Sequence, residues 1–231
     1  MQTRDQIKDI IENGVVKDIF LFERSHAMIQ TIKKHSDTID SNKENFKDLF
    51  ITIYSALTTE AVLAVARIYD NPNKNYPTRC LKGMLEHLIA YSKELPEIKE
   101  PYQLKLSLET KIVPDDLIKA IQDSPTTFPN LLSDFIKKEL EKPENVDAIK
   151  KLKDLRDKAM AHNERVAQID EPSWVALNDL CDLSKYVVGA LSWAYFSTAY
   201  TVNGKYILTD DAQKTSYSLT RLINKVYSDS A

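Results

Sequence analysis

Apolar side chains recur at helical spacing through the first third of the chain. They repeat every three or four positions over residues 4–34, which predicts an amphipathic helix. A polar stretch at residues 35–42 breaks the pattern and offers helix-capping side chains. Residues 46–69 are almost all apolar or small, which predicts a helix buried on all sides at the centre of a bundle. The turn-forming residues 70–73, with a proline among them, end this helix.

The middle of the chain combines shorter helical patterns with prolines. We expect a helix over residues 78–95, with an apolar inner face. That face comprises Leu81, Met84, Leu85, Leu88 and Ile89. Five prolines within residues 96–129 predict an irregular inserted segment with one or two short helices, for example at residues 115–122. Helical spacing resumes at residues 131–136, and a further long helix is expected over residues 146–160.

A long apolar helix and a turn dominate the C-terminal third. Glu171-Pro172-Ser173 is a good helix start, because proline is tolerated in the first turn, and the helix runs to about Tyr200. Residues 186–204 carry no formal charge over nineteen positions, near the length that spans a bilayer. Because they include several hydroxyl side chains and follow a charged helical region, we expect a core helix and no membrane partner. Asn203-Gly204 between β-forming residues predicts a short hairpin or a tight turn before a last helix at residues 211–227.

Glycine is scarce in this chain, and that narrows the fold class. The chain holds 4 glycines in 231 residues, whereas average usage of about 7% would supply about sixteen. Sheets joined by tight turns need glycine, so an all-β fold is nearly excluded. We therefore predict an all-α multi-helix bundle, formed as a single helical domain over residues 1–231 with segment 96–129 inserted in it.

Charge and cysteine content exclude several kinds of partner and site. The net charge is −3 and the sequence pI is about 5.9, so nucleic-acid binding has to come from a local basic patch. Cys80 and Cys181 lie far apart without CxxC spacing, which indicates neither a disulfide framework nor a zinc site. Glu23 and His26 supply only one of the two Glu-x-x-His pairs of a di-iron bundle, so we expect no metal and no cofactor. The polar N-terminus is unlike a signal peptide and favours a cytoplasmic protein.

One charged helix stands out as a candidate functional segment. On a helix, Ala148, Leu152, Leu155 and Ala159 form a narrow apolar stripe. Arg156 and His162 flank this stripe on opposite sides, about 120° apart at about 100° per residue. Because they are six positions apart, they are too distant for an ordinary contact within one helix. They can cooperate if the helix ends near residue 161, or if a second copy of the same helix packs across the stripe.

This segment resembles a known family. The run Arg156-Asp157-Lys158-Ala159-Met160-Ala161-His162 is similar to the R-x(4–6)-H motif of the HEPN superfamily of helical RNases, with a polar residue directly after the arginine. Residues 56–70 more specifically resemble the AbiU-type abortive-infection branch. The resemblance covers roughly residues 40–200 in architecture, and few of its residues are diagnostic.

The resemblance implies a metal-independent endoribonuclease of a phage-defence or toxin-like system. His162 would transfer a proton as the 2′-hydroxyl attacks the phosphate, and Arg156 would stabilise the charge on the phosphoryl oxygens. Asp157 would orient one of these two side chains. The family also implies a homodimer whose two motifs face one cleft, with an antitoxin or another phage-defence protein as a further partner.

A local excess of positive charge surrounds this motif. Residues 148–165 hold six basic and three acidic side chains, inside a chain whose net charge is −3. Five of the basic residues are candidates for holding the RNA backbone. They are Lys150, Lys151, Lys153, Lys158 and Arg165.

Three other interpretations compete with the RNase. In the first, Arg156 is a surface residue paired with an acid four positions away, and His162 caps the end of a helix. In the second, the chain is a non-catalytic HEPN-like helical adaptor that binds a protein or RNA partner. In the third, the bundle holds two metal ions or a small ligand.

Overall fold

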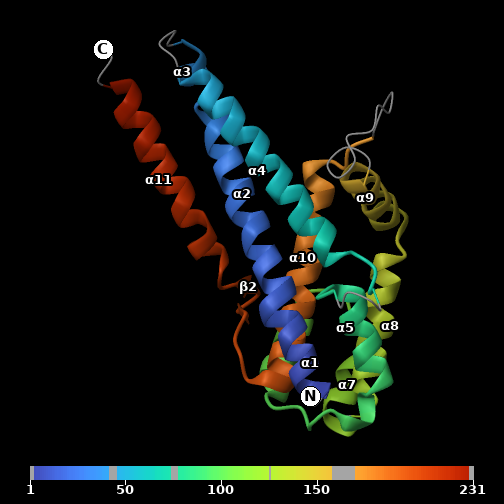
Figure 1. The fold of residues 1–231 in the computed structure, drawn as a ribbon. Coiled ribbons are helices and arrows are strands. Elements are labelled where there is room, and N and C mark those ends of the chain that lie inside the picture. The colour runs from blue at the N-terminus through green and yellow to red at the C-terminus, as the bar shows by residue number, and fades with distance from the viewer. Residues whose placement is uncertain (1–2, 42–45, 74–77, 125, 158–169, 229–231) are drawn as a thin grey trace.

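The chain folds as a bundle of helices with one small hairpin (Figure 1). A computed structural model describes residues 3–41, 46–73, 78–124, 126–157 and 170–228. The helices are α1 (Thr3–Ile10), α2 (Val16–Lys34), α3 (Ser36–Ser41), α4 (Lys47–Ile68), α5 (Leu81–Ala90), α6 (Pro101–Leu108), α7 (Asp115–Asp123), α8 (Phe128–Leu140), α9 (Pro143–Asp154), α10 (Trp174–Leu191) and α11 (Thr209–Ser228). Short helical turns lie at η1 (Ile11–Val15), η2 (Ser92–Glu94) and η4 (Ser192–Phe196). The predicted all-α class is confirmed.

Helix α2 is the spine of the N-terminal half. It continues from α1 through the π-helical turn η1, as the apolar pattern over residues 4–34 predicted. Helices α2, α4 and α11 lie side by side and extend beyond the rest of the bundle (Figure 1). Two ion pairs join α2 to α4, one between Arg24 and Glu60 at 3.0 Å and one between Asp18 and Arg67 at 2.6 Å. The Asp18 side chain is nearly buried, so losing Arg67 would leave a carboxylate without its partner.

The prediction that α4 is buried on all sides is wrong for its first half. Leu49 and Ile51 are 51% and 55% exposed, whereas Val65 and Ile68 are fully buried. The first half lies in the part of the bundle that extends outward, where few other helices cover it (Figure 1). Among the helices that the structure describes, α4 is long and apolar enough to cross a membrane by length and composition alone. Of the residues in its most apolar 18-residue stretch, 33% are buried inside the protein.

Residues 174–196 form the core helix expected in the C-terminal third. Helix α10 and turn η4 carry fully buried side chains such as Val187, Leu191 and Tyr195. The helix ends at Ser197, whose φ of 51° lies in the left-handed region. The first half of the uncharged segment, residues 186–195, is therefore packed inside this bundle, whereas residues 202–204 are exposed.

The hairpin prediction is confirmed. Strands β1 (Thr201–Val202) and β2 (Lys205–Tyr206) pair antiparallel, with Thr201 opposite Tyr206. Asn203 and Gly204 join them with φ angles of 49° and 72°, as a primed hairpin turn requires. A two-stranded ribbon is marginal on its own, and Trp193 Nε1 holds it to the bundle by donating to the Thr201 carbonyl at 2.9 Å.

Two smaller predictions differ from the structure. Residues 36–41, expected to interrupt the helices, form the short helix α3 after a break at His35. Ile89, expected on the inner face of its helix, is 36% exposed, while the four other residues of that face are buried.

The proline-rich segment 96–129 carries α6, α7 and the start of α8, and its Leu104 and Leu117 belong to the main core.

Ser173 caps α10, and its replacement tests how strongly this helix start is fixed. Its hydroxyl accepts a hydrogen bond from the Ala176 backbone N–H at 3.1 Å. Ser173→Ala is expected to lower the free energy of unfolding by about 1 kcal/mol, and Ser173→Gly by only a few tenths. Urea unfolding of the two variants measures this difference, and equal losses would contradict a capping role.

Candidate functional site

The end of α9 brings the predicted motif against the bundle. Ala148, Leu152 and Leu155 are all buried, as the stripe prediction required, and they belong to the main core. Ala159, the fourth residue of the predicted stripe, lies outside the described residues. Helix α9 packs against α4 and α10. Residues 155–157 continue it as a π-helical turn, so Arg156 and Asp157 lie where the described part of this helix ends.

Arg156 is held by two carboxylates from different parts of the chain. Its Nε donates to Asp157 Oδ1 at 2.7 Å, and its Nη1 lies 3.0 Å from Asp70 Oδ2. Asp157 and then Asp70 raise the pKa of Arg156, so the guanidinium remains charged. The Arg156 side chain is 22% exposed, so an oriented, permanently charged group still reaches solvent.

Asp70 is the site residue that the sequence did not identify. Asp70 closes the segment 56–70 that resembles the AbiU-type branch and was interpreted as part of a helix end, but nothing along the sequence indicates that it meets Arg156. Its position follows from Tyr69, whose hydroxyl donates to the Leu180 carbonyl at 2.6 Å and lies 3.0 Å from Ser184 Oγ. Burial raises the pKa of Tyr69, which keeps this donor protonated. The end of α4 is thereby fixed on α10, with Asp70 facing α9.

The structure describes three of the six other predicted site residues. His162, Lys158 and Arg165 lie outside the described residues. Lys150 and Lys153 are exposed on α9. Lys151 is half-buried and pairs with Asp147 at 2.8 Å, so it is not free to meet an RNA phosphate without breaking that pair.

Glu23 and His26 do not converge on a metal position. Glu23 Oε1 pairs with Lys185 at 2.7 Å and accepts a hydrogen bond from Thr209. The His26 ring stacks between Phe22 and Trp174, with ring centroids 5.6 and 5.1 Å away. Within the described ranges, no group of three His, Cys, Asp or Glu side chains is placed to hold a metal ion.

Comparison with known proteins identifies a family. The model of the family described as AbiU2, a HEPN-type family, matches residues 6–215. Neither a curated protein nor a solved structure matches the chain. The matched range includes both α4 with Asp70 and the segment from Arg156 to His162.

Proposed function

Because the chain belongs to the AbiU2 family of HEPN domain proteins, we propose that it is a metal-independent endoribonuclease of a phage-defence or toxin-like system. The family itself places the chain among abortive-infection HEPN domains. The observation that carries the proposal is the geometry of Arg156, which two carboxylates orient at the start of the R-x(4–6)-H run.

The chemistry uses one group that can accept or donate a proton and one cation held in a fixed position. The 2′-oxygen attacks the neighbouring phosphorus, the P–O5′ bond breaks, and the products carry a 2′,3′-cyclic phosphate and a 5′-hydroxyl. His162 takes the 2′ proton or supplies one to the leaving oxygen, since an imidazole titrates near neutrality. Arg156 stabilises the charge that develops on the non-bridging oxygens. Asp70 and Asp157 act as positioning residues, because each contacts the guanidinium.

A second copy of the chain completes the proposed site. Two motifs facing one cleft give a homodimer with two arginines and two histidines near the bound RNA. Lys150, Lys153, Lys158 and Arg165 then supply backbone contacts, and Lys151 joins them if its pair with Asp147 opens. We propose that residues 1–231 act as one domain in the cytoplasm, and that an antitoxin or another defence protein controls it.

RNA cleavage in the presence of EDTA tests this function. A mixed RNA pool is expected to yield fragments with 2′,3′-cyclic phosphate ends, because the mechanism needs no metal. The same RNA with 2′-O-methyl groups is the matched control and should stay intact, because it lacks the attacking hydroxyl. Cleavage of the methylated RNA, or cleavage only with added Mg²⁺, would contradict the mechanism.

The contacts of Arg156 also favour a second candidate, a non-catalytic adaptor. Arg156 pairs with two carboxylates of its own chain. Purely structural ion-pair networks contain the same arrangement. An adaptor would bind RNA or a protein partner with no cleavage, and the Arg156→Ala variant would bind and cleave no differently from the wild type.

Asp70→Asn tests whether Asp70 positions Arg156. The amide keeps the size of the side chain and removes its charge, while Asp157 still contacts the arginine. We expect a cleavage rate about tenfold lower, because a small misplacement of a catalytic group is costly. Asp134→Asn is the matched control on the exposed side of α8. Single-turnover cleavage and urea unfolding are measured for both variants, and a loss of stability that fully accounts for the lower rate would contradict a positioning role.

A further inference from the structure

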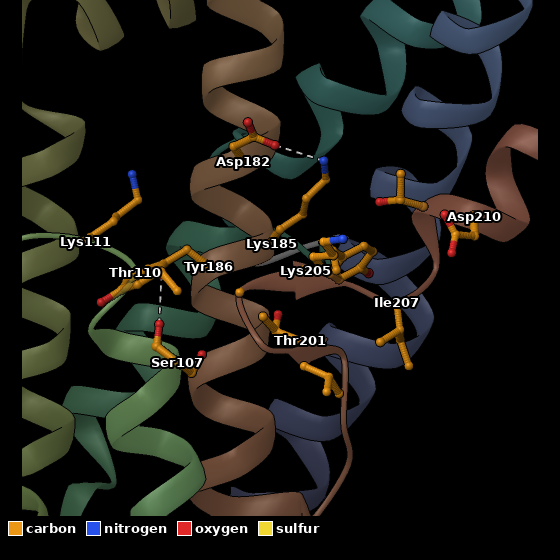
Figure 2. A pocket seen from close by; sticks show the side chains of 14 residues that line it. Ser107, Thr110, Lys111, Asp182, Lys185, Tyr186, Thr201, Lys205, Ile207 and Asp210 are labelled. Carbon is orange, nitrogen blue, oxygen red and sulfur yellow. Dashed lines mark hydrogen bonds and ion pairs between the residues drawn. The ribbon is translucent and has the colours of Figure 1, made fainter.

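A cavity of about 660 Å³ lies between the hairpin, one face of α10 and the end of α6 (Figure 2). Its walls come from segments that are far apart in the sequence, including Ser107, Lys111, Lys185 and Lys205. The volume falls within the range of about 300–1,000 Å³ that is typical of small-molecule sites. None of these residues takes part in the chemistry proposed for Arg156.

The cavity is formed by a close approach of the hairpin to α10. A Cβ atom on Gly189 would lie 2.4 Å from Thr201 Oγ1, so only glycine permits this contact. At the hairpin tip, a Cβ on Gly204 would lie 3.4 Å from the Thr110 methyl group. The hairpin therefore rests on α10 along one side and on the end of the α6 segment at its tip, which leaves the cavity between them already formed.

Two residues of the wall carry a buried hydroxyl group that has no hydrogen-bond partner among the described residues. These groups are Thr201 Oγ1 and the hydroxyl of Tyr206, a residue that is 8% exposed. Burial raises the pKa of Tyr206, as does the nearby Glu23, so its hydroxyl remains protonated and able to donate. Neither oxygen has accessible surface before binding, so a ligand acceptor reaches it only if the hairpin shifts, and that contact would remove the free-energy cost of an unpaired buried donor.

Two lysines at the cavity favour an anionic ligand. Lys111 and Lys205 have no carboxylate partner in the part of the chain that the structure describes, and Lys111 lies over the Tyr186 ring at 5.8 Å. Lys185, by contrast, pairs with two carboxylates, those of Glu23 and Asp182, and Figure 2 shows the contact with Asp182. Asp210 is an exposed carboxylate in the first turn of α11, where the helix dipole stabilises it.

From these groups we propose that the cavity binds a small phosphorylated organic compound. Among the wall residues, the unpaired donors are Lys111, Lys205, Thr201 and Tyr206, set against the single unpaired carboxylate of Asp210. A phosphate group supplies several strong acceptor oxygens and the negative charge that two lysines require. The volume exceeds what a bare phosphate fills, and the hydroxyls of Ser107 and Thr110 together with Asp210 suit a hydroxylated remainder.

This cavity lies across α10 from the candidate catalytic residues. Leu180 and Ser184 on α10 contact Tyr69, next to Asp70. Asp182 and Lys185 line the cavity, and at about 100° per residue they lie on the opposite face of the helix. Binding in the cavity is therefore independent of Arg156, and Arg156→Ala should leave it unchanged.

Backbone-amide NMR of the full chain, titrated with ribose 5-phosphate, orthophosphate and ribose, tests the proposal. We expect both phosphates to shift the amides of residues 201–206, and ribose to leave them in place. Lys111→Gln and Lys205→Gln should each weaken ribose 5-phosphate binding about tenfold, because each removes a charged contact. Lys214→Gln, on the exposed side of α11 and paired with Asp211, is the matched control and should bind like the wild type.

Tyr206→Phe separates a ligand contact from a folding effect. It removes an unpaired buried hydroxyl, so the unliganded protein should unfold at the same urea concentration or higher. Binding of ribose 5-phosphate should nevertheless weaken. Three results would overturn the proposal: hairpin amides unmoved by millimolar ribose 5-phosphate and orthophosphate, equal shifts with ribose, or the same affinity in the Lys111, Lys205 and Lys214 variants.

Discussion

Replacing Arg156 with alanine is expected to lower the rate of RNA cleavage by at least about a hundredfold. Removing one fixed group that stabilises a developing negative charge costs about 10²–10³ in rate. Arg156 is well placed for that role, because Asp70 and Asp157 orient its guanidinium while 22% of the side chain remains exposed. The measurement is single-turnover cleavage of one defined RNA in EDTA, with the 2′,3′-cyclic product quantified.

Arg156→Lys refines this test. Lysine keeps the positive charge and loses the planar fork that contacts two carboxylates and a phosphate together. We therefore expect a rate between those of the wild type and the alanine variant. Lys150→Ala, on an exposed position of the same helix, is the control for a general loss of positive charge, and it should weaken RNA binding without lowering the rate at saturating RNA.

The folding stability of these variants has to be measured alongside the rate. Arg156→Ala leaves Asp70 and Asp157 facing each other, with side chains 31% and 44% exposed. Solvent screens charges at such positions, so the loss in unfolding free energy should stay within about 1 kcal/mol. Wild-type cleavage by a folded Arg156→Ala protein would contradict the catalytic assignment and favour the adaptor.

Local sequence signals predicted most of the fold because they are physical constraints on short segments. Apolar spacing located the helix of residues 4–34, and Asn203-Gly204 located the hairpin turn, since left-handed backbone at two successive positions suits these two residues. The stripe of Ala148, Leu152 and Leu155 was buried as predicted, because helical spacing places those positions on one face.

The features that the sequence did not reveal depend on how segments meet. Apolar composition alone cannot say how many neighbours surround a helix, so the exposure of Leu49 and Ile51 on α4 was missed. The pairing of Asp70 with Arg156 joins α4 and α9 across the bundle. The cavity draws on α6, α10, the hairpin and α11, and no local pattern marks such a convergence.

Gly14→Ala is expected to cause the largest loss of stability among the variants considered. Gly14 is buried in the π-helical turn η1, between α1 and α2. A Cβ there would lie 2.3 Å from Arg79 Cβ and 2.6 Å from the Arg79 carbonyl oxygen. Because Arg79 backbone is part of the clash, α1 and the segment before α5 must move apart. Overpacking of this kind costs about 1–3 kcal/mol and occasionally more, and it would also strain the ion pair of Arg79 with Asp9.

Gly83→Ala is the matched control, because its surroundings accept a methyl group. The nearest atom to a Cβ at Gly83 is Cys80 Sγ at 3.4 Å, followed by Pro72 Cβ at 3.6 Å. In helix α5, alanine is favoured over glycine by up to about 1 kcal/mol, so this variant should match or exceed the wild type in urea unfolding. Gly14→Ala also gains some of this intrinsic preference, so any net loss is a lower bound on the cost of the clash with Arg79. Equal unfolding midpoints for the two variants would show that residue 79 moves away at no cost, and that the close packing of η1 on this segment does not stabilise the bundle.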